Sequence, residues 1–260
     1  MPCLDDTRIK LSYEVNEKDE EDDYYATDYI HANYVDGYKQ KNAYISTQGP
    51  LDETCDDFWK MIWQEKMLVI VMTTKCMEQN RKKCSQYWPA VENESFRFKS
   101  FEIENKNVDL RDNFIISKLL IKNLKTDKER EVVHCQFTSW PDHGIPKTAN
   151  DMIEFIHIVR QYQANLTHSN NWKGHPLGPP ILVHCSAGIG RTGTFITIDI
   201  NINRLLDSKK IDVKDTVLKI RTQRALSVQM PDQYVFCYMA LIEYAIQENL
   251  LIADLEELFC

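Results

Sequence analysis

The sequence predicts a single α/β domain. Apolar runs typical of buried strands alternate with segments of helical periodicity along the 260 residues. Residues 88–140 indicate a series of antiparallel strands rather than repeated βαβ units. No internal repeat, low-complexity tract or Pro/Ser-rich linker divides the sequence. Because this length suits one large domain, we expect residues 1–260 to form one unit.

The first part of the chain predicts strands and one helix. Residues 14–23 are mostly acidic and indicate a solvated loop. Residues 28–38 and 43–50 alternate apolar and polar side chains and end at turn residues, which predicts two strands. Residues 52–66 predict a helix, because acidic residues crowd its first turn and apolar residues share one face. Residues 67–74 form a continuous apolar run typical of a buried strand.

The later elements follow from the same patterns. The predicted antiparallel strands are residues 96–108, 114–124 and 130–140, and the predicted helices are residues 148–163, 213–224 and 231–248. Residues 181–184 predict another buried strand. Residues 194–202 fit a helix by their apolar stripe and a strand by their many β-branched side chains. The local pattern leaves both possibilities open.

Composition and charge exclude several classes of function. The hydrophobic fraction of 43% and the charged fraction of 27% are ordinary for a globular protein. A formal net charge of −8 argues against a general affinity for nucleic acids or anionic membranes. The N-terminus lacks the apolar region of a signal peptide, and no apolar segment is long enough for a membrane span. We therefore expect no nucleic-acid or membrane partner.

The cysteines indicate a reducing compartment. They are scattered without a C-x-x-C pair or metal-ligand spacing, and the histidines do not cluster with them. The eight cysteines are Cys3, Cys55, Cys76, Cys84, Cys135, Cys185, Cys237 and Cys260. Disulfide frameworks are typical of short secreted chains, so we expect free thiols in the cytoplasm. Seven of these thiols are expected to be buried and inert, and Cys185 is the expected exception.

One loop carries two motifs at once. Residues 183–193, VHCSAGIGRTG, contain the G-x-G-x-x-G pattern of dinucleotide-binding sites. That pattern also requires repeated βαβ units and an acidic residue about 20 positions further on. Asp207 and Asp212 only bracket this distance, and the antiparallel run contradicts the repeated units. A lone glycine pattern of this kind is weak evidence, so the nucleotide-binding hypothesis ranks last.

The same loop also contains C-x-x-x-x-x-R. A glycine-rich turn from a strand into a helix points its backbone N–H groups inward and forms an anion site. Cys185 begins this loop, where the positive potential favours a reactive thiolate. Arg191 can contact two phosphoryl oxygens with its planar guanidinium. Thr192 can donate a hydrogen bond to the sulfur, and His184 can order the loop.

A cysteine that attacks phosphorus also needs an acid for the leaving oxygen. Residues 140–146, WPDHGIP, offer Asp142 in a loop that Trp140 can anchor. Alone, an aspartate in such a Pro/Gly loop is usually a turn residue. Its combination with the Cys185 loop favours a role as general acid.

These motifs together resemble those of the tyrosine-specific protein phosphatases. Further blocks agree in order, and the resemblance covers about residues 4–247. The blocks are DYIHANYVDGY, YISTQGP, DFWKMIW, EQNRKKCSQYWP, HCQFTSWPDHG and RTQRALSVQMPDQY. The resemblance implies a twisted mixed sheet flanked by helices, no metal or other cofactor, and phosphotyrosine-containing proteins or peptides as substrates of a monomer. It also suggests short members of the family, including some from insect viruses, which would act in the host-cell cytoplasm.

The resemblance assigns roles to matching residues. Cys185 would be the nucleophile that forms a phosphocysteine, and Asp142 would be the general acid and then the base. Gln229 and Gln233 would position water, Glu78 would pair with Arg191, and Lys83 would pair with the Asp142 loop. The substrate-binding residues would be Ser186, Ala187, Gly188, Ile189, Gly190, Arg191, Gln229 and Asp142, of which Ala187, Ile189 and Gln229 would flank the phenyl ring.

The sequence departs from the family pattern at several positions. The family domain normally begins earlier, with an N-R-Y block whose tyrosine forms one wall of the phosphotyrosine slot; that block is not in this sequence. Smaller departures are His31, Asn80, Ser227 and Met230. Two alternatives therefore accompany an active tyrosine phosphatase: a phosphotyrosine-binding module with little turnover, which shields its substrates, and a dual-specificity phosphatase with a shallow slot.

Overall fold

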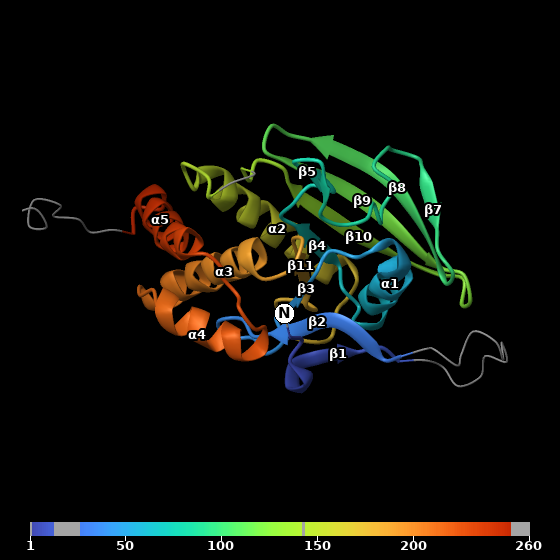
Figure 1. Cartoon of the computed structure of the whole chain (residues 1–260), viewed down its shortest axis with the longest axis horizontal. Coiled ribbons are helices and arrows are strands. Elements are labelled where there is room, and N and C mark those ends of the chain that lie inside the picture. Colours follow the sequence, from blue (N-terminus) through green and yellow to red (C-terminus); the bar gives the residue numbers. More distant parts are fainter. Residues whose placement is uncertain (1, 13–26, 142–143, 251–260) are drawn as a thin grey trace, which may run out of the picture.

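A mixed sheet forms the centre of the molecule (Figure 1). The computed structural model describes residues 2–12, 27–141 and 144–250. Within these ranges nine strands pair in the order β1-β2-β3-β11-β4-β10-β9-β8-β7. Their bounds are β1 Arg8–Lys10, β2 Tyr29–Val35, β3 Tyr44–Thr47, β4 Val69–Met72, β7 Ser95–Arg97, β8 Phe101–Leu110, β9 Phe114–Asn123, β10 Lys128–Phe137 and β11 Ile181–His184. The acidic run at 14–23 lies outside the described residues.

The pairing directions confirm the predicted combination of strands. The four central strands β3, β11, β4 and β10 are parallel. The flanking pairs β10–β9, β9–β8 and β8–β7 are antiparallel, as expected for residues 88–140. On the other side β1, β2 and β3 are also antiparallel. The parallel centre places the carboxyl ends of β4 and β11 next to each other, which is where binding sites of open α/β sheets lie.

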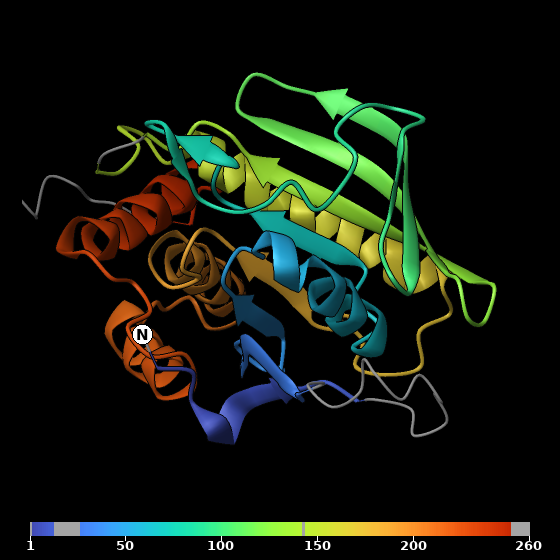
Figure 2. The same cartoon turned by 45° about the vertical axis from the view of Figure 1, so that its right-hand side comes forward.

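Helices cover both faces of the sheet (Figure 2). Val69 and Val71 of β4 pack into the core beneath α2, α3 and α5. Ile70 and Met72 point the other way, into the core that contains α1. This explains the uninterrupted apolar run, because a strand covered on both faces needs no polar side. The helices are η1 Asp5–Thr7, η3 Asp52–Thr54, α1 Cys55–Gln64, α2 Asn150–Ser169, α3 Gly190–Ser208, α4 Val213–Gln223 and α5 Pro231–Gln247.

The structure settles the segment that the sequence left open. Residues 194–202 belong to α3, and all of them are buried. The helix keeps its polar side chains satisfied by local bonds: Thr194 Oγ1 donates to Gly190 O and Asn201 Nδ2 donates to Thr197 O, at 2.9 and 3.0 Å. Burial on nearly all sides therefore overrides the strand preference of the β-branched residues.

A two-stranded hairpin, β5 Met77–Glu78 and β6 Arg81–Lys82, lies beside the carboxyl end of β4 (Figure 1). Its turn residues Gln79 and Asn80 have φ values of 49° and 57°. Both values are in the left-handed region, which explains why a glycine would suit this turn and why asparagine is tolerated.

The cysteine prediction needs one correction. The seven cysteines of the described part are free thiols, and five of them are buried. Cys3 and Cys76 are only half-buried, because they lie on the N-terminal segment and at the edge of the β5–β6 hairpin. The prediction of burial is therefore wrong for these two residues, and Cys260 lies outside the described residues. No helix in the described ranges has the length and apolarity to span a membrane.

Candidate active site

The loop of residues 185–189 connects β11 to α3 and turns at the carboxyl end of the sheet. Its carbonyl oxygens are held from outside: Ser186 O accepts from Gly49 N, and Ile189 O accepts from Val228 N, at 2.9 and 3.0 Å. Gly188 O accepts from Ser46 Oγ at 3.2 Å. Because the peptide carbonyls point outward, the N–H groups of the same peptides point inward and form an anion-binding concavity.

Glycine is required at position 188. Its φ is +67°, and a Cβ atom there would lie 2.0 Å from the carbonyl oxygen of Thr47. Gly193 is required for a different reason, since a Cβ there would lie 2.5 Å from Val228 N. The glycines of the motif therefore allow this loop and α3 to pack closely against the sheet and the residues after α4.

Cys185 lines a cavity of about 170 Å³ and is 6% exposed. The cavity brings together most of the predicted site. Its lining residues are Thr74, Glu78, Lys83, Cys185, Ser186, Ala187, Ile189, Gly190, Arg191, Gln229 and Gln233. Thr74 is the member that the sequence analysis did not identify; it donates to Glu78 Oε1 at 2.9 Å.

The predicted pairing of Glu78 with Arg191 is present. Arg191 donates to Glu78 Oε1 and Oε2 at 2.7 and 3.1 Å. Thr73 O accepts a further hydrogen bond from Arg191 at 3.2 Å. Burial raises the pKa of Glu78, but the hydrogen bond and the charge of Arg191 outweigh it and lower the pKa overall. The carboxylate therefore stays ionised at neutral pH and holds the guanidinium at the cavity.

The predicted acid loop begins next to the same guanidinium. The guanidinium carbon of Arg191 lies 5.6 Å from the ring centroid of Trp140, and Pro141 O accepts from Arg191 at 3.4 Å. Trp140 is buried, and its Nε1 donates to Gly144 O at 3.1 Å. Asp142 itself lies outside the described residues, so its pairing with Lys83 stays a prediction.

His184 contacts the loop and belongs to a network that the sequence did not reveal. Its Nδ1 is 3.0 Å from Cys185 O, and its Nε2 is 2.7 Å from the hydroxyl of Tyr87. The same hydroxyl is 2.8 Å from Nε2 of His134. Burial lowers the pKa of His184 to about 4 and lowers that of His134 as well. Both imidazoles are therefore neutral at neutral pH.

Gln233 makes a hydrogen bond that was not predicted, and Thr192 lacks the one that was. Gln233 Oε1 accepts from Met230 N at 3.1 Å, so part of its side chain caps α5. Thr192 Oγ1 is buried and has no hydrogen-bond partner in the described part of the chain. The expected hydrogen bond from Thr192 to the Cys185 sulfur is therefore not formed in this structure.

Arg224 is a site residue that sequence reasoning missed. It is fully buried, and it donates to Ala187 O and Gly188 O, both at 3.0 Å. It also donates to His31 Nδ1 and Asn33 Oδ1, both at 2.9 Å. The motif RTQRALSVQMPDQY contains Arg224, but nothing in a sequence pattern distinguishes a buried arginine from a solvated one.

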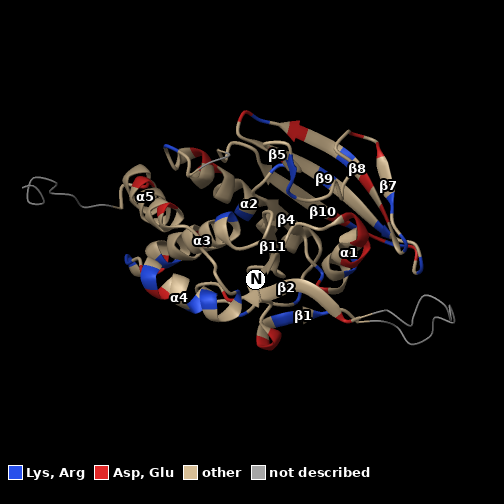
Figure 3. Ribbon diagram, viewed as in Figure 1, with Lys and Arg blue, Asp and Glu red and all other residues tan. Residues whose placement is uncertain are grey.

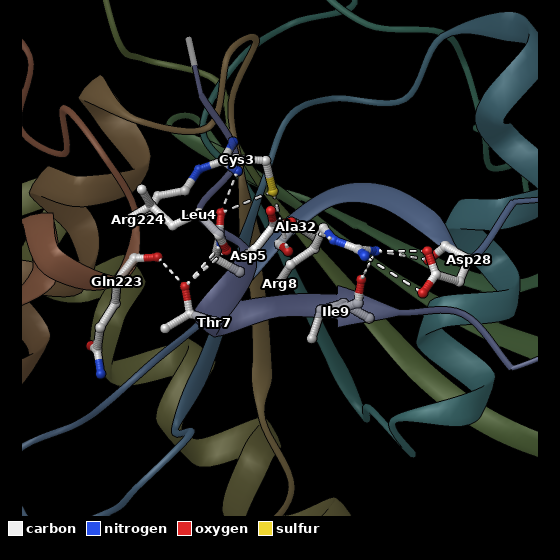
Figure 4. Close-up of polar contacts among 11 residues, drawn as sticks. Cys3, Leu4, Asp5, Thr7, Arg8, Ile9, Asp28, Ala32, Gln223 and Arg224 are labelled. Atoms are coloured by element: carbon white, nitrogen blue, oxygen red, sulfur yellow. Dashed lines mark hydrogen bonds and ion pairs between the residues drawn. The ribbon is translucent and has the colours of Figure 1, made fainter.

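The N-terminal segment covers the region around Arg224 (Figure 4). Thr7 Oγ1 donates to Gln223 O at 2.6 Å, and Asn33 Nδ2 donates to Leu4 O at 2.9 Å.

No group of three or more His, Cys, Asp or Glu side chains that could hold a metal ion occurs in the residues that the structure describes.

The chain is similar to known proteins over almost its whole length. The family model for protein-tyrosine phosphatase matches residues 1–243. Tyrosine-protein phosphatase non-receptor type 9 of Homo sapiens is 47% identical over 253 residues, which are 96% of this chain and 41% of that protein. Receptor-type tyrosine-protein phosphatase C of Homo sapiens is 45% identical over 219 residues, or 84% of this chain and 16% of that protein. The chain therefore spans less than half the length of these relatives.

Proposed function

This chain belongs to the protein-tyrosine phosphatase family, and on this premise we propose that it hydrolyses phosphotyrosine in proteins and peptides. The observation that carries the proposal is the shared cavity of Cys185 and Arg191, in which Glu78 fixes the guanidinium. The inward N–H groups of residues 186–191 and the guanidinium complement a phosphoryl dianion.

The first chemical step transfers the phosphoryl group to Cys185. The sulfur attacks phosphorus, the bond from phosphorus to the tyrosyl oxygen breaks, and Asp142 gives its proton to that oxygen. The loop amides and Arg191 stabilise the charge on the equatorial oxygens. Glu78 occupies the edge of the Arg191 guanidinium that Nη1 and Nη2 form, which leaves Nε as the donor for the phosphoryl group.

The second step releases phosphate. Water attacks the phosphocysteine, Asp142 accepts a proton from this water, and the bond from phosphorus to sulfur breaks. Gln229 and Gln233 line the cavity and position the water. Ala187, Ile189 and Gln229 flank the phenyl ring. Lys83, in the cavity wall, and the buried Trp140 support the acid loop.

We also propose that the chain acts as one monomeric catalytic domain in the cytoplasm, without a membrane or nucleic-acid partner. Both core clusters lie on the same central sheet, which supports one domain. The free thiols of the described residues suit a reducing compartment, and the net charge of −8 disfavours polyanionic partners. Sedimentation equilibrium of the full chain tests the monomer.

The test of the activity is hydrolysis of a phosphotyrosine peptide in EDTA. Wild-type protein should release phosphate, and Cys185→Ser should release none while still binding the peptide. Cys76→Ser in dithiothreitol is the matched control and should keep wild-type turnover. Binding without turnover by the wild type would instead indicate a phosphotyrosine-binding module. Equal turnover of a phosphothreonine peptide would indicate dual specificity.

A further inference from the structure

Two thiols outside the phosphate loop face each other at the base of the β5–β6 hairpin. The sulfur of Cys84 lies 3.9 Å from that of Cys76 and donates a hydrogen bond to it. Lys83 N donates to Cys76 O at 2.8 Å, which continues the hairpin pairing up to these residues. A disulfide bond is about 2.05 Å long, so the sulfurs must approach by about 2 Å.

The two thiols differ in accessibility and in acidity. Cys76 is half-buried, whereas Cys84 is buried. The hydrogen bond from Cys84 lowers the pKa of Cys76, with a smaller contribution from the charge of Lys82, although burial opposes both. The same hydrogen bond, together with burial, raises the pKa of Cys84. Figure 3 shows the basic residues of this hairpin beside β5. Cys76 is therefore the thiol that ionises first and that a small oxidant reaches first.

Cys55 is not expected to react with an oxidant in place of Cys76. The Cys55 thiol donates a hydrogen bond to Leu51 O, at a sulfur-to-oxygen distance of 3.2 Å. Burial, followed by the charge of Asp52, raises the pKa of Cys55 to about 11. It is therefore a protonated, poorly nucleophilic thiol at neutral pH.

We propose that Cys76 and Cys84 form an oxidative modification site, at which hydrogen peroxide converts the two thiols into a disulfide. The Cys76 thiolate attacks one peroxide oxygen, the O–O bond breaks, and the released hydroxide takes a proton to leave as water. The sulfur of Cys84 then attacks the sulfenic sulfur of Cys76, the S–O bond breaks, and the Cys84 proton leaves with a second water. One peroxide is reduced and two thiols are oxidised, and a dithiol reductant reverses the reaction.

The hairpin connects this site to the phosphate loop. Glu78, which holds Arg191, lies between the two cysteines in the chain. Lys83 O accepts a hydrogen bond from Ser186 Oγ at 3.0 Å. Cys84 also packs behind the loop, because a Cβ at Gly49 would lie 2.4 Å from Cys84 Cβ and 2.8 Å from Cys185 O. Drawing the sulfurs together therefore displaces groups that position Arg191, and oxidation lowers the phosphatase activity; this last step rests on the proposed function.

The disulfide is tested without any activity measurement. The full chain carrying Cys185→Ser is treated with hydrogen peroxide, and its intact mass and peptide map are recorded. The expected product has lost two hydrogen atoms and contains a peptide that joins residues 76 and 84. Cys76→Ser and Cys84→Ala in the same background should not form this product. Absence of the cross-link, or a cross-link of Cys84 to Cys55, would overturn the proposal. In the wild-type chain, which retains Cys185, a cross-link of Cys84 to Cys185 instead of to Cys76 would also overturn the proposal.

The effect on activity is tested with inorganic phosphate bound at Cys185 during oxidation. After removal of phosphate and peroxide, wild-type kcat/KM should be at least about 10-fold lower, since a displacement of about 1 Å can cost up to about 100-fold. Dithiothreitol should restore it, and Cys76→Ser should lose no activity. Equal loss in both proteins, or a disulfide without any loss, would overturn the coupling. If the wild-type chain had no phosphatase activity before oxidation, the proposed function would be wrong. The mass measurement would still show whether the disulfide between Cys76 and Cys84 forms.

Discussion

Arg191 and Glu78 are 113 residues apart in the chain, yet the guanidinium donates two hydrogen bonds to the two oxygens of this carboxylate. The pair is only slightly exposed, with side-chain exposures of 15% and 5%. Thr74 Oγ1 and Lys75 N also donate to Glu78 Oε1, so the carboxylate is itself held by the start of the hairpin. The orientation of the Arg191 guanidinium is therefore set by a different segment from the one that carries it.

The first prediction is that Glu78→Gln lowers kcat/KM for a phosphotyrosine peptide by about 10–100-fold, the equivalent of about 1.5–3 kcal/mol for a hydrogen bond between charged groups. Glutamine keeps the shape but loses the charge, so the guanidinium is no longer fixed. Steady-state kinetics measure the change, and inorganic phosphate should inhibit the variant more weakly. The exposed Glu129→Gln is the control, and a variant within twofold of wild type would show that Glu78 does not position Arg191.

The second prediction separates backbone conformation from close packing. Gly188→Ala should lower the free energy of unfolding by about 2–5 kcal/mol, because strain at positive φ and a clash with Thr47 O add together. Gly144 has a φ of +71°, but among the described residues the nearest atom to a Cβ there is Asp232 Oδ2, at an ordinary contact distance of 3.7 Å. Gly144→Ala should therefore cost only about 1–2 kcal/mol. Urea unfolding of both variants measures the difference, and equal losses would refute the packing argument.

The third prediction concerns Arg224. Burial lowers the pKa of Arg224 to about 10, so the side chain is still a cation at neutral pH. Arg224→Met removes the buried donor of Ala187 O, while Gly188 O keeps its hydrogen bond from Ser46 Oγ. An unsatisfied carbonyl costs about 1–3 kcal/mol, and the loop loses its outward anchor. We expect lower stability together with a fall in kcat, measured by urea unfolding and peptide hydrolysis. The exposed Arg97→Met should change neither. A variant that lost stability but kept kcat would limit Arg224 to a folding role.

Much of the site could be predicted because its chemistry is local in sequence. Cys185, Arg191 and the intervening glycines occupy one short loop, and this loop must follow a strand and precede a helix to collect its N–H groups at one point. The antiparallel strands were predictable for a similar reason, since alternation along one strand reports directly on its two faces.

The remainder depends on contacts between distant segments. Tyr87 lies 47 residues from His134 and 97 from His184, and no pattern in the sequence places these three rings together. The helical state of residues 194–202 was set by burial from several sides rather than by local propensity. Arg224 could not be identified from the sequence because two of its partners are backbone carbonyls, which every sequence contains, and its side-chain partners His31 and Asn33 lie 193 and 191 residues away.

The final prediction concerns the pH dependence of stability. His184 Nδ1 faces the carbonyl oxygen of Cys185 and must donate to it, so the neutral ring accepts from the Tyr87 hydroxyl. The Tyr87 oxygen in turn accepts from Nε2–H of His134. This network needs both histidines neutral, and burial lowers the pKa of each; that of His184 falls to about 4. An unfolded histidine has a pKa of about 6.5.

Between these two values the unfolded chain binds protons that the folded chain does not. The free energy of unfolding should therefore be highest above about pH 6.5 and should fall as the pH is lowered through this window. His184 alone contributes a loss of about 3 kcal/mol by pH 4. Urea unfolding between about pH 7 and pH 5 measures the slope. His134→Gln should reduce the slope by up to about 1.4 kcal/mol per pH unit, whereas the exposed His168→Gln should leave it unchanged. A stability that stays constant over this range would mean that the folded protein accommodates a charged imidazole behind Cys185.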